Sequence, residues 1–359
     1  MREDTPRRRK WVVRKSASGT EHRVFVWDDM PRQNDAYLRC SIYLYRSEKE
    51  AREGADEGGS GCLVGVRSEL DPFGLRGHLY AVTNRHVVKD EGCQFIRYNT
   101  MPDGSDVLLT EGSWTWDKED DLAVAPVELP AWARYMSIGL DYFSVTPEKI
   151  EEYNIGLGDD VFMVGRLLGN EGKGRDVPAL RFGNISRMPD ADEPIEIGGR
   201  KQEAYLVEMR SISGYSGSPV FFYAPMHSVP DNNMKERRGW AIGPLLLGID
   251  CGHLRENIAV RTSAGRPHPD GSYVHSNSGM AAVIPVWRLR RLLNSRRLLV
   301  ERREKDEQRL AEKQRGRGGF DADYTAREES EGITREGFED ALRKAFPRPS
   351  ESESGSDET

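Results

Sequence analysis

The stretch GYSGSPV, residues 214–220, decides how this chain is interpreted, because it sets a serine between glycines just ahead of an apolar run. Glycines beside a serine permit tight turns with positive φ and let a substrate carbonyl approach the backbone closely. Backbone N–H groups in such a loop can face a developing oxyanion. Taken alone, the stretch is equally typical of an ordinary turn, because Ser, Gly and Pro are common turn residues.

Two upstream segments give the serine its possible partners. TNRHVV, residues 83–88, contains His86, and DDLAV, residues 120–124, contains Asp121. A serine hydroxyl is a weak nucleophile until a neighbouring base takes its proton, and histidine suits that role because it titrates near neutral pH. The three segments therefore supply, in this order, a histidine, an aspartate and a serine, which are the residue types of a catalytic triad: His86, Asp121 and Ser216. Asp120 stays open as the alternative carboxylate, because it directly precedes Asp121.

Around these segments, the sequence pattern indicates many short strands separated by turn residues. Strands are expected at residues 23–27, 37–45, 62–66, 78–83, 160–165, 180–186, 204–209, 220–223, 244–249 and 280–285. Many short strands with regular turn signals predict an all-β fold. Two antiparallel β-barrels of six strands each fit residues 37–286, followed by a C-terminal helix and a charged tail.

The domain organisation follows from this pattern. We expect an N-terminal arm over residues 1–36 and one domain over residues 37–295. Within it, the first barrel covers about 37–135, the second about 150–286, and a helix begins near 286 and continues to about 314. Residues 296–359 form a charged helical extension and a disordered acidic tail, with a short amphipathic helix at 334–346.

Composition excludes several functional classes. The 359 residues carry a net charge of −7, and residues 301–359 account for −5 of it, so the body is nearly neutral and predicts no nucleic-acid partner. The N-terminus lacks the apolar core of a signal peptide, and no apolar run is long enough to span a membrane. The four cysteines form no CxxC pair, which favours a reducing, cytoplasmic location. Cys251 and His253 offer too few ligands for zinc, so neither a metal nor a cofactor is expected.

The quoted motifs resemble those of the trypsin-like serine peptidases with the chymotrypsin fold, in particular the bacterial HtrA-like branch. Further strings agree with that family: Gly59-Ser60-Gly61 before a strand, GDDVFMVG at residues 158–165, and GMAAVIP at residues 279–285. The resemblance covers about residues 37–295. The segment after the barrels is short and charged for a PDZ domain, so none is expected.

The resemblance implies roles for individual residues. Ser216 is the expected nucleophile, His86 the general base and Asp121 the group that orients the histidine, and the N–H groups of Gly214, Tyr215 and Ser216 form the oxyanion hole. The residues that would line the primary substrate pocket are Arg210, Ser211, Cys251, Gly252 and His253. An arginine there would favour an acidic substrate residue, although Arg210 can equally point to solvent. Arg85 and Tyr215 depart from the residues common in the family.

The resulting hypothesis is a serine endopeptidase that hydrolyses protein or peptide substrates through an acyl-enzyme, without a cofactor. The C-terminal segment is either a docking site for a protein partner or a solubilising tail. Two other functions remain possible: a binding or scaffold module on the same fold, and a latent protease that a partner activates.

Overall fold

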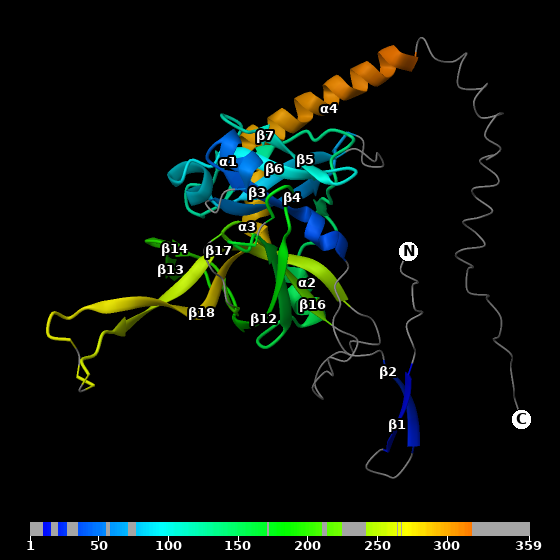
Figure 1. Ribbon diagram of the computed structural model, residues 1–359. Helices are drawn as coiled ribbons and strands as arrows, with labels where there is room; N and C mark the ends of the chain where they lie inside the picture. Colours follow the sequence, from blue (N-terminus) through cyan, green and yellow to red (C-terminus); the bar gives the residue numbers. More distant parts are fainter. Residues whose placement is uncertain are drawn as a thin grey trace, which may run out of the picture. The chain divides into compact units, whose positions relative to one another are not determined.

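The computed structural model describes residues 10–15, 21–26, 35–54, 58–70, 77–170, 172–209, 214–224, 242–263, 265–266 and 268–317. They divide into two units. The first runs to Leu299, without residues 69–71, and contains every strand of the described residues (Figure 1). The second contains the rest of the last helix from Val300, with Glu69 and Leu70. None of the helices in the described residues is both long and apolar enough to cross a bilayer.

The first half of the β-structure is a curled eight-stranded sheet. Its hydrogen-bonded order is β7-β6-β3-β4-β5-β9-β8, and β10 pairs in parallel with β4. The strands are β3 (Ser41–Tyr45), β4 (Gly59–Val66), β5 (His78–Thr83), β6 (Phe95–Thr100), β7 (Gly104–Leu109), β8 (Thr115–Trp116), β9 (Ala123–Pro126) and β10 (Ile138–Gly139). Within the described residues, the two ends of this sheet are not hydrogen-bonded to each other, so it is a partial barrel.

The second half is a closed six-stranded barrel with the order β11-β12-β15-β18-β17-β16. Its strands are β11 (Asp160–Gly165), β12 (Ala179–Arg187), β15 (Tyr205–Glu208), β16 (Pro219–Ala224), β17 (Ile242–Ala259) and β18 (Tyr273–Pro285). A small separate hairpin, β13 (Ile195–Ile197) with β14 (Arg200–Gln202), follows β12. The expected all-β class is confirmed: one of the two expected six-stranded barrels is closed, and the other is a partial barrel of eight strands.

One hydrophobic cluster joins the two halves. It contains Cys62 and Tyr80 from the sheet together with Phe162 and Phe221 from the barrel, all buried. The rings of Phe162 and Phe221 stack with centroids 5.0 Å apart. Burying apolar surface from both halves in one core holds them together as a unit, which fixes the loops at their junction.

Several expected element boundaries are wrong. Residues 37–40 belong to a 3-10 helix, η1 (Asp35–Cys40), and the strand begins only at Ser41. The expected helix after residue 286 is two helices, α3 (Val286–Leu293) and α4 (Arg296–Arg317), because Asn294 and Ser295 interrupt it. The strand expected at 23–27 is β2 (Glu21–Val26), paired with β1 (Lys10–Lys15). The helix expected at 334–346 lies outside the described residues.

Two short helices begin at residues that are typical of helix N-termini. Helix α1 (Glu48–Glu53) begins with a capping box, in which Ser47 and Glu50 each accept a hydrogen bond from the other's backbone N–H. Helix α2 (Pro147–Tyr153) begins after Thr146, with proline at its first position. The capping box and the Thr-Pro pair can both be recognised in the sequence alone.

A buried charged cluster attaches the segment after β11 to the first sheet. Arg97 of β6 is fully buried and donates to the carboxylate of Asp176 at 2.5 Å and to the carbonyl of Gly172 at 3.0 Å. The guanidinium groups of Arg97 and Arg166 lie 5.2 and 4.6 Å from the ring centroid of Tyr45, which provides cation–π contacts. Burial raises the pKa of Asp176 to about 7, although Arg97 and Arg166 act to lower it.

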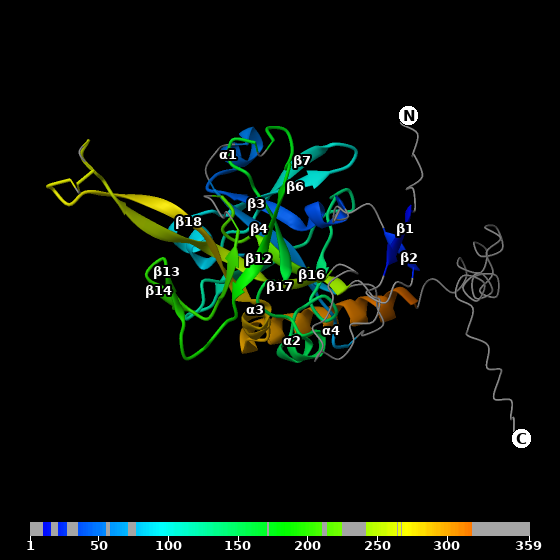
Figure 2. The same cartoon turned by 90° about the horizontal axis from the view of Figure 1, so that it is seen from below.

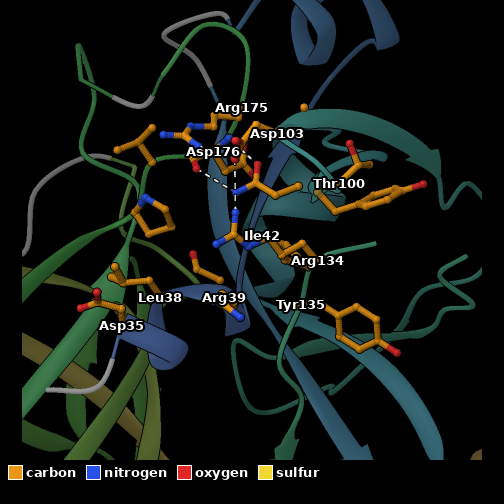
Figure 3. A pocket seen from close by; sticks show the side chains of 16 residues that line it. Asp35, Leu38, Arg39, Ile42, Thr100, Asp103, Arg134, Tyr135, Arg175 and Asp176 are labelled. Carbon is orange, nitrogen blue, oxygen red and sulfur yellow. Dashed lines mark hydrogen bonds and ion pairs between the residues drawn. The ribbon is translucent and has the colours of Figure 1, made fainter. Parts of the chain in front are cut away.

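Replacing Asp176 with alanine is expected to lower the free energy of unfolding at pH 8 by about 3–5 kcal/mol, because two buried arginines lose their carboxylate. Asp103→Ala is the matched control. Asp103 lines the same pocket as Asp176 (Figure 3), but its side chain is 65% exposed and its pairs with Arg134 and Arg175 are on the surface. That control should cost at most about 1 kcal/mol. Urea denaturation measures both, and equal effects would contradict the prediction.

Candidate active site

The loop that carries Ser216 lies directly before β16. Gly214 and Gly217 have φ of +91° and +90°, values that side chains rarely adopt. The N–H of Ser218 donates to the carbonyl of Tyr215 at 2.8 Å and closes a turn around Ser216. Tyr215 is fully buried, whereas Ser216 is partly exposed. The turn therefore anchors the tyrosine in the core and leaves the serine accessible.

Both halves of the fold hold this loop. From β4, the N–H of Ser60 donates to the carbonyl of Ser216 at 3.0 Å, and the Ser60 hydroxyl donates to the carbonyl of Gly214 at 2.6 Å. From β17, the carbonyl of Asp250 accepts the N–H of Gly217 at 2.9 Å. A Cβ on Gly217 would lie 2.1 Å from the carbonyl oxygen of Ser60, so only glycine permits this close approach.

His86 follows β5 and begins a short π-helix, η2 (His86–Asp90). Its Nδ1 lies 2.5 Å from Oδ2 of Asp121, and its backbone N–H donates to Oδ1 of the same carboxylate at 2.9 Å. A neutral imidazole that donates from Nδ1 leaves Nε2 as a hydrogen-bond acceptor. The carboxylate therefore fixes both the ring orientation and the tautomer that a general base needs.

Ser60 connects the serine loop to the histidine segment. Its N–H contacts Ser216, and its carbonyl accepts the hydroxyl of Thr83 at 2.7 Å. Thr83 ends β5, three residues before His86. A Cβ on Gly217 would lie 2.4 Å from the Thr83 hydroxyl, which shows that the two segments touch. The fold thus brings the three predicted segments together at the junction of the sheet and the barrel.

The neighbouring carboxylate, Asp120, has a different set of partners. It accepts from Nε of Arg288 at 2.7 Å and from Arg291 at 3.0 Å, both on α3. Asp120 is 1% exposed and Asp121 is 7% exposed, so both carboxylates are buried. Of the two candidates left open by the sequence, Asp121 contacts the histidine and Asp120 contacts the helix.

The family model described as "Trypsin-like peptidase domain" matches residues 59–223, a range that includes His86, Asp121 and Ser216. This range, a little under half of the chain, is similar to a trypsin-like peptidase domain. No curated protein matches the sequence.

Two solved structures are similar to this chain. One is Deg5, with 17% sequence identity and a TM-score of 0.39 over 72% of this chain and 88% of that chain. The other is HBP, with 10% identity and a TM-score of 0.40 over 74% of this chain and 93% of that chain.

The peptidase domain supports Asp121 with two side chains that the sequence analysis did not single out. The side-chain amide of Asn84 donates to the carbonyl of Asp121 at 2.9 Å. The N–H of Asp121 donates to Oε1 of Gln202 at 3.2 Å, and the Gln202 amide donates in turn to the carbonyl of Glu119 at 3.2 Å. Gln202 is far away in sequence, on β14, and no motif marks it. Asn84 lies within the quoted TNRHVV motif, and this was the only indication in the sequence that either residue belongs to the site.

The expected substrate-pocket residues of the trypsin-like peptidase lie in different places. Arg210 and Ser211 fall outside the described residues. Cys251 is buried in the core, where its thiol donates to the carbonyl of Ala282 at 3.3 Å and where burial raises its pKa. Gly252 has φ of +128°, and His253 is half-buried, with its pKa lowered by burial and by Arg255.

The described residues contain no group of three or more His, Cys, Asp and Glu side chains arranged to hold a metal ion. Cys40, Cys62, Cys93 and Cys251 are all free and buried. The junction of the two halves presents a hydroxyl on Ser216, an imidazole on His86 and a carboxylate on Asp121, together with the backbone N–H groups of the glycine-flanked loop.

Proposed function

We propose that this trypsin-like peptidase is a serine endopeptidase, with Ser216 as nucleophile, His86 as general base and Asp121 as the group that orients His86. The observation that carries the proposal is the double hydrogen bond from His86 to the Asp121 carboxylate, beside the loop that presents Ser216. A histidine oriented by a carboxylate, near a partly exposed serine, is the kind of arrangement that acyl transfer requires.

In the proposed reaction, Oγ of Ser216 bonds to the carbonyl carbon of the substrate while its proton passes to Nε2 of His86. The same proton then goes to the leaving amine as the C–N bond breaks, which leaves an ester on Ser216. Water hydrolyses that ester by the same route. The N–H groups of Gly214, Tyr215 and Ser216 are proposed to stabilise the oxyanion, each being worth about 3–4 kcal/mol of barrier.

A fluorophosphonate probe tests the proposal directly, because it reacts only with an activated serine hydroxyl. We expect one adduct, on Ser216, in the wild-type protein and none in Ser216→Ala. Ser218→Ala is the matched control. Its hydroxyl is fully buried and has no hydrogen-bond partner within the described residues, so labelling should persist. A folded wild-type protein that takes up no probe would contradict the proposal and favour a scaffold or a latent enzyme.

The pH dependence of kcat/KM is expected to follow the titration of His86. Burial lowers the pKa of this imidazole, but the hydrogen bond and charge of Asp121, with Glu91 and Asp90, outweigh burial and raise the pKa above its ordinary value of about 6.5. Since only the neutral ring accepts a proton, activity should rise with pH, with a midpoint above that value.

Glu91→Gln gives the matched comparison, because it removes one of the charges that raise the His86 pKa. Its activity midpoint should lie at a lower pH than that of the wild type. Steady-state kinetics between pH 5 and pH 9 measures both profiles. A wild-type midpoint below the ordinary histidine value, or a shift to higher pH in the variant, would contradict the assignment.

A further inference from the structure

Tyr215, the residue directly before the candidate nucleophile, packs its side chain into the core of the closed barrel. It is fully buried and belongs to a hydrophobic cluster that includes Met163 of β11 and Val220 of β16. Its hydroxyl is buried and forms no hydrogen bond with the described residues. The tyrosine is therefore held by its ring and not by its hydroxyl.

Two neighbouring strands of the barrel hold this ring. A Cβ on Gly165, at the end of β11, would lie 2.8 Å from Cδ1 of Tyr215, so the ring lies directly against the β11 backbone. The guanidinium carbon of Arg181, on β12, is 4.8 Å from the ring centroid, which is a cation–π distance. Strands β12 and β16 flank β11 (Figures 1 and 2), and the serine loop leads directly into β16. The ring thus contacts one glycine and one cation.

The charge of Arg181 has no anionic partner in the described part of the chain. Its side chain is partly buried, and its Nε is buried without a hydrogen-bond partner there. A partly desolvated cation that forms no ion pair costs free energy unless another group stabilises it. The face of an aromatic ring attracts a cation, more strongly where water is excluded. The ring of Tyr215 therefore stabilises this charge, and the charge in turn fixes the ring.

The serine loop depends on such an anchor because glycines flank it. Gly214 and Gly217 have positive φ and lack the side chains that would restrict the backbone. Hydrogen bonds hold the carbonyls of Gly214 and Ser216 and the N–H of Gly217. Within the described residues, no hydrogen bond occupies the N–H of Tyr215 or of Ser216. The position of Tyr215 therefore directs these two N–H groups.

We propose that Arg181 is a positioning residue for the oxyanion hole. Through the ring of Tyr215, its charge holds the two peptide planes that carry the N–H groups of Tyr215 and Ser216. The inference rests on the proposed function, in which these N–H groups stabilise the oxyanion. In this role Arg181 affects the reaction only through Tyr215.

The expected kinetic effect is on kcat. Donors directed at an oxyanion contribute more to the transition state than to the bound substrate, whose carbonyl carries less charge. Arg181→Leu removes the charge and keeps an apolar side chain in the barrel. It should lower kcat about tenfold and leave KM within about twofold of the wild type. Active sites are counted by the end point of fluorophosphonate labelling, so that a loss of folded protein is not measured as a loss of kcat.

A double-mutant cycle tests whether Arg181 acts through Tyr215. Tyr215→Leu removes the ring and should lower kcat by about the same factor as Arg181→Leu. Because both substitutions break one contact, the variant that carries both should again lose about tenfold in kcat, and not about a hundredfold. A hundredfold loss would show that the two residues act independently and would overturn the proposal.

Arg187→Leu is the matched control, because it makes the same change on the same strand. The guanidinium of Arg187 donates to the carbonyl of Glu193 at 2.7 Å, and its loss should leave kcat unchanged. Arg181→Lys keeps a cation at the position that matters and should retain more activity than Arg181→Leu. Equal losses of kcat in Arg187→Leu and Arg181→Leu would contradict a specific role for the contact with Tyr215.

Amide hydrogen exchange tests the anchor without catalysis. The N–H groups of Gly217 and Ser218 are hydrogen-bonded in the serine loop, so their exchange reports local opening. Exchange should be about tenfold faster in Arg181→Leu than in the wild type and unchanged in Arg187→Leu. Unchanged exchange in Arg181→Leu would overturn the proposal, whether or not the protein is active. Faster exchange in a protein whose wild type takes up no fluorophosphonate would contradict the proposed function but support the anchoring of the loop by Arg181.

Discussion

Replacing Ser216 with alanine is expected to lower kcat/KM for peptide hydrolysis by about 10⁴-fold or more. In the proposed mechanism, the Ser216 hydroxyl supplies the atom that bonds to the substrate carbonyl. The residual rate would come from substrate binding and oxyanion stabilisation, which the substitution leaves in place. Hydrolysis of denatured casein and of a fluorogenic peptide, followed over hours at high enzyme concentration, measures an effect of this size.

Two controls make this result interpretable. The Ser216→Ala protein should unfold at the same urea concentration as the wild type to within about 0.5 kcal/mol, because Ser216 is held through its backbone carbonyl. Ser218→Ala, two residues away and fully buried, should retain activity. Full activity in a folded Ser216→Ala protein would show that another residue carries the reaction.

Asp121→Asn is expected to lower kcat by about 10⁴-fold, because the amide no longer stabilises the imidazolium and can hold His86 in the wrong tautomer. In the wild-type protein, the Asp121 carboxylate accepts one hydrogen bond from Nδ1 and one from the backbone N–H of His86. An asparagine can accept one of these hydrogen bonds through its oxygen, but it presents an NH₂ group to the other donor. Steady-state kinetics measures the loss, and proton NMR of the His86 ring reports the change in tautomer.

Asp120→Asn is the matched substitution at the adjacent position. Asp120 bonds to Arg288 and Arg291, whereas Asp121 bonds to His86, so the kcat of the Asp120→Asn protein should remain within a few-fold of the wild type. The Asp120→Asn substitution should instead lower the free energy of unfolding, because Arg288 on α3 loses a charged partner. If Asp120→Asn abolished turnover while Asp121→Asn spared it, the assignment of Asp121 would be wrong.

Local motifs carried much of the information about the site. TNRHVV, DDLAV and GYSGSPV placed a histidine, two aspartates and a serine in order, and the fold brings their segments together. Which of Asp120 and Asp121 contacts His86 could be decided only from the tertiary structure. Adjacent residues on a chain leaving a turn point in different directions, and only the positions of His86 and α3 show which carboxylate faces which partner.

Other parts of the fold lacked a readable signal. Tyr37 and Leu38 match the alternating pattern of a strand, but they lie in a 3-10 helix that packs them against the shared core. The break between α3 and α4 was missed because Asn294 and Ser295 are tolerated within a helix. The continuation of β17 and β18 past the barrel was not predicted from the sequence. The residues in this part of the two strands are mostly polar and are exposed on both faces, so they show no alternation of core-facing apolar residues.

The sequence by itself determined the β-rich class, the order of the three site segments and the glycines that the serine loop requires, because these depend on short-range patterns and on backbone freedom. Only the tertiary structure decided that Asp121 is the carboxylate that contacts His86, that Ser60 and Gln202 hold the site from a distance, and that β17 continues beyond the barrel. Those features depend on which distant strands pair and in which register, and register is set by the packing of the whole β-structure and not by any one segment.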